Sequence, residues 1–247
     1  MITYEIENVP IHFFDNKDEI KDIFEALLCN GKNKISFINP EIFMQQQKNE
    51  ALHNYFLSCN YNFVDGIGLL KAINKYCNTT YNYENRFPGT DFFTYLPNRK
   101  IKLFFYGSKM ENILKAKAII EKRYDNYEIV DYFDGYTPIE DDVLINRINS
   151  SGANILIVCK GCPKQELWIN NNFDKLKVNL VFGNGGSIDF WSGAIKRAPN
   201  FMIKHGLEFI YRLFQNFTLK RIKRQSKLIK FLFLYKLKKY NITKIDS

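Results

Sequence analysis

The 247-residue chain contains no apolar run near the roughly 20 residues that a membrane-spanning helix needs, which argues against an integral membrane protein. Its first residues, MITYEIENVP, lack the basic and apolar regions of a secretory signal, so we expect a cytoplasmic protein. Internal repeats and low-complexity linkers are also missing. Hydrophobic residues make up 46% of the chain and charged residues 25%, which is ordinary for a globular domain and excludes wholesale disorder.

Common cofactor motifs are missing as well. The chain has no Asp-x-Asp pair, and its glycine-rich stretch from Gly183 departs from GxGxxG at Ile188 and lacks the lysine of a P-loop. The five cysteines include Cys159 and Cys162 at CxxC spacing, but no second cysteine pair or nearby histidine accompanies them. We therefore expect no metal site, no dinucleotide cofactor and ordinary reduced thiols.

What is present is an alternation of short apolar runs with helical patterns. The helical patterns cover roughly residues 41–58, 67–77, 109–124, 138–150 and 164–175. Several of the runs between them are apolar on both faces, as buried parallel strands are. The alternation predicts an α/β fold: a single compact domain with a mainly parallel sheet flanked by helices. The expected strands are Lys34–Ile38, Tyr61–Val64, Lys102–Tyr106, Glu128–Tyr132, Ile155–Cys159 and Val178–Phe182.

Polar residues and glycines come directly after these expected strands. Ligands of parallel sheets bind beyond the carboxyl ends of the strands, so the residues found there are candidates for a functional site. They are Asn39-Pro40, Asp65-Gly66, Gly107, Asp134-Gly135-Tyr136, Gly161 and Gly183 to Gly186.

Three segments can carry chemistry. In FVDGIGLLKA, Asp65 stands at a strand-to-helix junction, where a carboxylate is either a catalytic group or a plain helix cap. In KGCPKQELWI, Gly161 and Pro163 precede a helix that begins with KQE. In GNGGSIDFWSGAIKRAP, a glycine-rich turn offers backbone amides that can approach a diphosphate.

The positive charge lies at the C-terminal end. Lys and Arg number 35 against 26 Asp and Glu, and thirteen of the basic residues fall between Lys196 and Lys239, where only Glu208 is acidic. The rest of the chain has 22 basic and 25 acidic residues, a net charge of −3. We expect residues 1–198 to form the core and residues 199–247 a basic helical appendage that docks on an anionic membrane, with FLFLY (Phe231–Tyr235) at the interface. A terminal helix that only packs on the domain is the alternative.

In order along the chain, these segments resemble the WecG/TagA/CpsF family of bacterial glycosyltransferases, glycosyltransferase family 26. The resemblance extends over about residues 5 to 225 and is most specific in PKQE and KRAP. The matching segments are Asn39-Pro-Glu, Asp65-Gly-Ile-Gly, Arg86-Phe-Pro-Gly-Thr-Asp91, Gly107, Gly135-Tyr136, Gly161-Cys-Pro-Lys-Gln-Glu166, Gly183-Asn-Gly-Gly with Asp189 and Gly193, Lys196-Arg-Ala-Pro199 and Gly206-Leu-Glu-Phe-Ile-Tyr-Arg212.

The resemblance implies an inverting, metal-independent transfer of a sugar, often N-acetylmannosamine, from a UDP donor to a polyprenyl-diphosphate-linked sugar. It places this reaction in surface polysaccharide synthesis on the cytoplasmic face of the cell membrane. It also implies a compact, GT-E-like α/β fold, no cofactor besides the substrates, and an appendage that reaches the membrane. No nucleic-acid partner is expected, and a homo-oligomer is left open.

The resemblance also assigns roles to single residues. Asp65 matches the family's proposed base, and an inverting transfer needs one group that takes the proton of the acceptor hydroxyl. Arg212, Arg221 and Arg224 match arginines that the appendage offers to the acceptor diphosphate, because a planar guanidinium grips phosphate oxygens. The donor-binding positions are Asn39, Gly66, Arg86, Gly107, Tyr136, Gly161, Lys164, Gln165, Gly183, Gly185, Gly186, Asp189 and Lys196, with Tyr136 and Asp189 near the uridine.

One departure from the family puts the donor sugar in question. Many relatives carry Thr two residues before Asn39, where this chain has Phe37. A donor such as UDP-glucose or a UDP-uronic acid is therefore the alternative within the same family. Two hypotheses lie outside it: a non-catalytic module in which the basic C-terminus binds membrane or nucleic acid, and a dinucleotide enzyme that modifies sugar nucleotides. The first does not require Asp65, the glycine turn or PKQE, and the departure from GxGxxG argues against the second.

Overall fold

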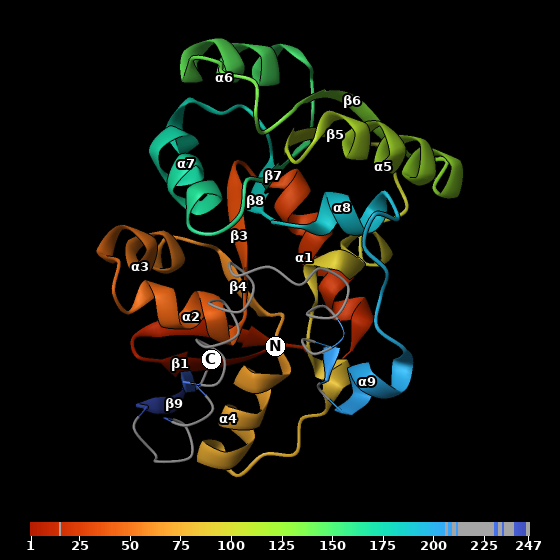
Figure 1. Ribbon diagram of the computed structural model, residues 1–247. Coiled ribbons are helices and arrows are strands. Elements are labelled where there is room, and N and C mark those ends of the chain that lie inside the picture. Colours follow the sequence, from red (N-terminus) through yellow and green to blue (C-terminus); the bar gives the residue numbers. More distant parts are fainter. Residues whose placement is uncertain are drawn as a thin grey trace.

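The strands join in one twisted sheet in the computed structural model, which describes residues 1–14, 16–205, 207, 208, 211, 230, 231, 234 and 240–245 (Figure 1). Over this part of the chain the sheet has nine strands in the order β6-β5-β7-β8-β3-β4-β2-β1-β9. Neighbours from β6 to β2 pair in parallel, whereas β1 pairs antiparallel with both β2 and β9. The prediction of a mainly parallel α/β fold is confirmed.

All six strands expected from the sequence are present, with small shifts at their ends. Strand β7 shows why these runs were recognisable, since all five residues of ILIVC are buried, as both faces of the sheet are covered. The six strands are β3 (Asn33–Ile38), β4 (Tyr61–Val64), β5 (Ile101–Gly107), β6 (Tyr127–Phe133), β7 (Ile155–Cys159) and β8 (Leu180–Gly183).

Three strands were not expected. β1 (Ile2–Ile6) and β2 (Val9–Phe13) form a hairpin, and β9 (Ile242–Ile245) adds to its outer edge. The hairpin turns at Glu7 and Asn8, which both have positive φ, the conformation that matches the twist of a tight hairpin. The sheet therefore extends beyond the parallel part at one end, where Figure 1 shows β9 in dark blue.

Helices cover both faces of the sheet. One face carries α2 (Pro40–Gln46), α3 (Glu50–Leu57), α4 (Ile67–Cys77), α6 (Asp141–Ser150) and α7 (Lys164–Asn172). The other carries α1 (Lys17–Cys29), α5 (Met110–Arg123), α8 (Ser187–Trp191) and the short 3-10 helix η2 (Gly89–Thr94). Two further 3-10 turns, η1 (Tyr83–Asn85) and η3 (Phe173–Lys175), lie in connections of the described chain.

The helices differ from the prediction in two respects. The stretch 41–58 forms two helices instead of one, because Asn49 caps α3 by accepting from the N–H of Leu52 at 3.0 Å. Helices α1 and α8 were not expected. The remaining predicted helices are present as α4, α5, α6 and α7.

The C-terminal segment begins with α9 (Asn200–His205), and most of the chain after this helix lies outside the described residues, including Arg212, Arg221 and Arg224. Phe231 is described and fully buried: its ring stacks on Tyr240 and meets Phe43 edge-on, with centroids 5.2 and 5.8 Å away. The expectation that Phe231 lies at a membrane interface is therefore wrong, because the ring belongs to the core. In the described part of the chain, the helices are too short or too polar to cross a bilayer.

Candidate active site

The carboxyl ends of β3 to β8 meet at one side of the sheet, which we call the carboxyl edge. Because β8 lies between β7 and β3, the turn of residues 183–186 is next to the loops after these two strands. β4 is the next strand along and ends just before Asp65. The topology thus brings the acid, the glycine turn and the PKQE segment to one region, and sets Gly107 and Tyr136 farther along the same edge.

Asp65 is half-buried and held by its backbone. Its N–H donates to the carbonyl of Ile38 at 2.9 Å, and its own carbonyl accepts from Arg86 Nη1 at 3.5 Å. The next residue, Gly66, lies so close to the start of α2 that a Cβ there would be 2.6 Å from Pro40 Cδ. The glycine allows the loops after β3 and β4 to meet, and this contact positions Asp65 at the carboxyl edge.

Substitution of Gly66 by Ala tests this close approach. The added methyl group must displace Pro40, and overpacking of this kind costs about 1–3 kcal/mol in the free energy of unfolding. We expect a lower midpoint of urea denaturation and reduced turnover, because Asp65 moves with the loop. Turnover equal to that of the unchanged protein would contradict the inference.

Asn39 has a structural contact as well as a candidate role. Its Oδ1 accepts from the N–H groups of Glu41 and Ile42, both at 3.0 Å, and so caps α2. The carboxamide oxygen is therefore committed to the helix, and the amide NH₂ is the group that can donate to a ligand.

Arg86 is a buried cation beside Asp65. It is 7% exposed, its Nη1 lies 3.5 Å from Glu208 Oε2, and within the described structure its Nε has no hydrogen-bond partner. Burial of a guanidinium with long contacts and an unused donor costs free energy unless further acceptors complete its shell. Phosphate or sugar oxygens are suitable acceptors.

The glycine turn packs on the PKQE helix. A Cβ at Gly183 would lie 2.7 Å from the Gln165 side chain, and one at Gly185 would lie 2.9 Å from Gly161 Cα. Gly185 and Gly186 are exposed, so their backbone amides are accessible to an anion. Lys164, also exposed, begins α7 beside them.

Two further side chains hold this turn and were not predicted from the sequence. Asn184 donates through Nδ2 to the carbonyl of Gly89 at 2.9 Å and accepts at Oδ1 from Ser187. The thiol of Cys159 donates to the carbonyl of Asn184 at 3.0 Å, and burial raises its pKa. Cys159 is therefore a packing residue, in agreement with the expectation of an ordinary thiol.

Asp189 joins the turn to the loop after β5. Its Oδ1 accepts from Ser108 Oγ at 2.6 Å and from Asn112 Nδ2 at 2.8 Å. Neighbouring Gly107 has a φ of 111°, and a Cβ on it would meet the carbonyl of Cys159. The ring of Tyr136, 74% exposed, lies on the loop after β6, so it is accessible to a flat ligand.

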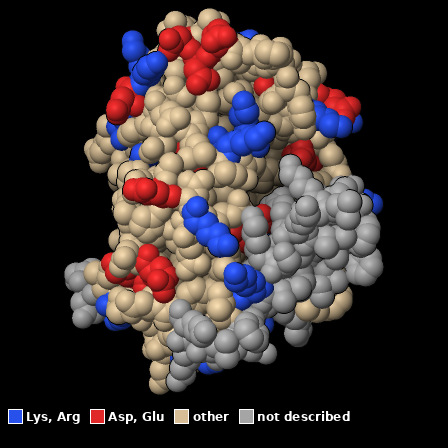
Figure 2. Space-filling model, turned by 60° about the vertical axis from the view of Figure 1, so that its left-hand side comes forward, with Lys and Arg blue, Asp and Glu red and all other residues tan. Residues whose placement is uncertain are grey.

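Cations surround this edge, but some are already paired. Arg197 forms an ion pair with Asp91 at 2.7 Å and so links KRAP to the loop of RFPGTD. Lys160 donates to the hydroxyl of Tyr106 and lies over its ring at 4.6 Å. Lys196 is exposed. Figure 2 shows Lys and Arg side chains in the middle of the face it presents, with Asp and Glu at its upper, left and right sides.

Two further observations concern the position of Phe37 and the grouping of potential metal ligands. Phe37 is buried and its ring contacts those of Phe87 and Phe182, so it belongs to the core beneath the Arg86 loop. Among the described residues, no cluster of three His, Cys, Asp or Glu side chains is arranged to hold a metal ion.

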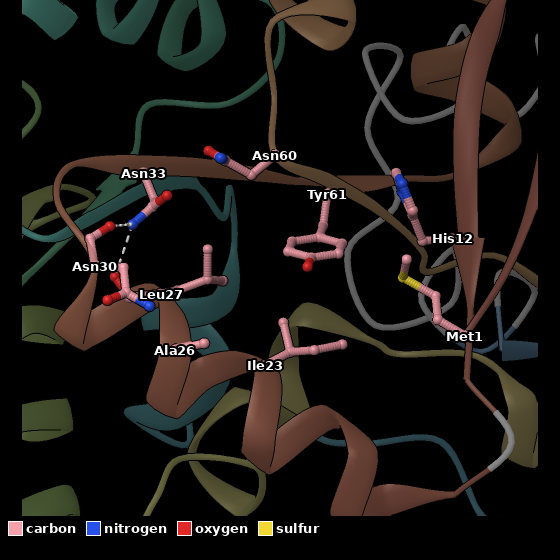
Figure 3. Close-up of a pocket in the computed structure, with 9 residues that line it drawn as sticks. All are labelled: Met1, His12, Ile23, Ala26, Leu27, Asn30, Asn33, Asn60 and Tyr61. Atoms are coloured by element: carbon pink, nitrogen blue, oxygen red, sulfur yellow. Dashed lines mark hydrogen bonds between the residues drawn. The ribbon is translucent and has the colours of Figure 1, made fainter. Parts of the chain in front are cut away.

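A surface pocket of about 380 Å³ lies at the opposite edge of the sheet, beside α1 and the starts of β3 and β4 (Figure 3). Tyr61 stands in it, with Asn60 on one side and Ile23 on the other. Burial lowers the pKa of His12 to about 4, and the N–H of Asn62 donates to its Nδ1. None of the predicted site residues lines this pocket, so it is separate from the carboxyl edge.

The fold and the carboxyl edge define an α/β protein with an acid, a buried arginine and an exposed glycine turn where parallel sheets bind their ligands. The sequence matches the model of the "Glycosyl transferase WecG/TagA/CpsF family" over residues 4–244. The N-acetylglucosaminyldiphosphoundecaprenol N-acetyl-beta-D-mannosaminyltransferase of Bacillus subtilis is 32% identical over 223 residues, 87% of this chain and 85% of that protein. The protein of the same name from Bacillus spizizenii is 32% identical over 195 residues, covering 75% and 73% of the two chains.

The chain therefore belongs to the WecG/TagA/CpsF family of glycosyltransferases. The resemblance recognised from Asp65, PKQE and KRAP is confirmed, and the protein is an enzyme of sugar transfer. The non-catalytic module and the dinucleotide enzyme are excluded as descriptions of the whole chain.

Proposed function

We propose that the enzyme transfers N-acetylmannosamine from a UDP donor to a polyprenyl-diphosphate-linked N-acetylglucosamine, with inversion and without a metal ion, in cell-wall polysaccharide synthesis. The acceptor and the transferred sugar are those in the names of the two Bacillus relatives. The observation that carries the proposal is the position of Asp65, at the carboxyl end of β4 and beside the buried Arg86.

The reaction follows from this arrangement. The acceptor hydroxyl attacks the anomeric carbon, its oxygen forms the new bond, and its proton goes to the Asp65 carboxylate. The bond from the anomeric carbon to the diphosphate breaks, and the electron pair leaves with UDP. The exposed amides of the glycine turn and the cation of Lys196 supply the stabilisation of the leaving charge that a metal ion gives elsewhere.

A donor assay with a lipid-diphosphate-N-acetylglucosamine analogue tests the proposal. We expect product with UDP-N-acetylmannosamine, identified by its mass, and a rate unchanged by a chelator. Transfer from UDP-glucose or a UDP-uronic acid instead would keep the reaction and change the sugar, the outcome that Phe37 leaves open. A large, reversible loss of rate with chelator would show that the metal-independent mechanism is wrong.

We further propose that the basic segment between Lys196 and Lys239 docks the enzyme on the anionic cytoplasmic leaflet and brings Arg212, Arg221 and Arg224 to the acceptor diphosphate. A simple truncation cannot test this, because β9 pairs with β1, and Phe231 and Tyr240 are buried in the core. The charges must be changed in the full chain.

Replacement of Lys220, Lys223 and Lys227 by Gln should weaken binding to anionic vesicles roughly 100-fold, since each basic residue near such a surface contributes about 1 kcal/mol. The same change at Lys100, Lys115 and Lys122, which are exposed on the core, is the charge-matched control. Vesicle sedimentation at low and high salt measures both. Equal loss in the two variants would mean that net charge, and not the basic segment, determines adhesion.

A further inference from the structure

Glu166 is a buried acid of the carboxyl edge that the proposed reaction does not use. It lies in the first turn of α7 and is 4% exposed. Within the part of the chain that is described, its Oε2 has no hydrogen-bond partner. Burial of an acceptor atom without a partner costs free energy. A hydrogen bond to the other oxygen, Oε1, should therefore contribute to the stability of this region.

One such contact is with Gln165, which is 2% exposed, and the Cys162 side chain is a second hydrogen-bonding neighbour of the carboxyl group. Gln165 Nε2 donates to Glu166 Oε1 at 2.8 Å, and Gln165 Oε1 accepts from the N–H of Gly161 at 2.9 Å. Both ends of the carboxamide are therefore occupied, and its orientation is defined. A flipped carboxamide would turn its NH₂ group toward the N–H of Gly161 and lose both bonds.

The glycine turn rests on this carboxamide. A Cβ at Gly183 would lie 2.7 Å from Gln165 Cγ and Nε2, and a Cβ at Gly185 would lie 2.9 Å from its Oε1. Only bare backbone fits against the side chain at these two positions. The position of the turn, and of its exposed amides, thus depends on how Gln165 is oriented.

The surroundings of Glu166 favour its neutral form. Tyr55 of α3, Cys59 after α3, and Cys162 before α7 are the titratable groups facing it, and none of them is a cation. Burial raises the pKa of Glu166. A neutral carboxyl group still offers a carbonyl oxygen to Gln165 Nε2, so the contact does not require a charge.

We propose that Glu166 is a positioning residue: it orients the Gln165 carboxamide, and through it holds Gly161 and the glycine turn in the shape that receives the donor diphosphate. The identity of this ligand as a diphosphate rests on the proposed UDP donor. The contact between Glu166, Gln165 and Gly161 is independent of that assignment.

The first test compares Glu166→Leu, which removes the acceptor, with Glu166→Gln, which restores an oxygen at the same place. Hydrogen exchange of the Gly161 amide, measured without ligand, should be about fivefold faster in the Leu variant and return to the original rate in the Gln variant. The Kd of the full chain for UDP, measured by calorimetry, should change in the same pattern. Unchanged exchange in the Leu variant overturns the proposal.

The second test asks whether Glu166 acts through Gln165. In a Gln165→Ala background, Glu166→Leu should weaken UDP binding no further. If the two substitutions instead act independently, their effects on the Kd for UDP would add, and this would contradict the proposal. If UDP does not bind the unchanged protein but the Gly161 amide responds as expected, the nucleotide assignment fails and the positioning role remains.

The protonation of Glu166 predicts a pH dependence. A carboxyl group whose pKa is raised by folding stabilises the fold fully below its ordinary value of 4.5, and this contribution is lost as the pH rises toward the folded-state value. Glu166→Gln has no such loss. Its free energy of unfolding relative to the unchanged protein should therefore increase as the pH rises above 4.5 in urea denaturation, and a constant difference would mean that folding does not raise the pKa of Glu166.

Discussion

Asp65→Asn is expected to reduce turnover about 10²–10⁴-fold while leaving the Kd for UDP near that of the unchanged protein. The amide keeps the shape of the side chain but cannot take the proton of the acceptor hydroxyl. The backbone contacts of Asp65 with Ile38 and Arg86 do not involve its carboxylate, so they remain available to Asn. Initial rates with a saturating lipid-linked acceptor, and calorimetry with UDP, measure the two effects separately.

Asp142→Asn is the matched control for this substitution. Asp142 lies on the surface, where it pairs with Lys175 at 2.7 Å, and exposed pairs contribute little to stability. Its variant should turn over substrate at the original rate. If Asp65→Asn keeps even half of the original rate, another group must act as the base.

Phe231→Ala should lower the free energy of unfolding by about 3–5 kcal/mol, the usual cost of removing a fully buried aromatic ring. The loss removes contacts with Phe43 and Tyr240, which join the C-terminal segment to α2. Urea denaturation measures the effect, and vesicle binding of the folded variant should be unchanged.

Phe201→Ala provides the comparison, because the ring of Phe201 is 61% exposed and its removal should change stability by no more than about 0.5 kcal/mol. A small stability change in Phe231→Ala together with lost vesicle binding would restore the interfacial role that the FLFLY pattern indicated. Burial of Phe231 in the core instead predicts a large loss of stability and unchanged vesicle binding.

The sequence was sufficient for the parallel part of the sheet because its strands are covered on both faces. A run as short and as rich in β-branched residues as ILIVC in β7 is typical of a buried strand, and a polar residue or glycine directly after each run marks the carboxyl edge. Asp65, Gly161 and the glycine turn were found in this way, and the structure brings them together.

What the sequence could not predict depends on long-range partners. β9 has three exposed residues in four, and it is a strand only because β1 lies beside it. The burial of Phe231 likewise requires Phe43, far away in the chain, and the same apolar run also fits a membrane surface. The order of the strands, which sets Asp65 near the glycine turn, comes from tertiary packing and has no local signature.

The pairing of β3 with β8 has a consequence for how the enzyme matures on the ribosome. This pairing joins two parts of the sheet that are each continuous in sequence, β1 to β4 and β5 to β8. Within it, Asn33 is paired with Leu180 and Ile35 with Phe182. Contacts across such a separation form late and slowly. A nascent chain therefore carries Asp65 through much of its synthesis before the glycine turn is made, and the carboxyl edge is complete only when β3 and β8 have paired.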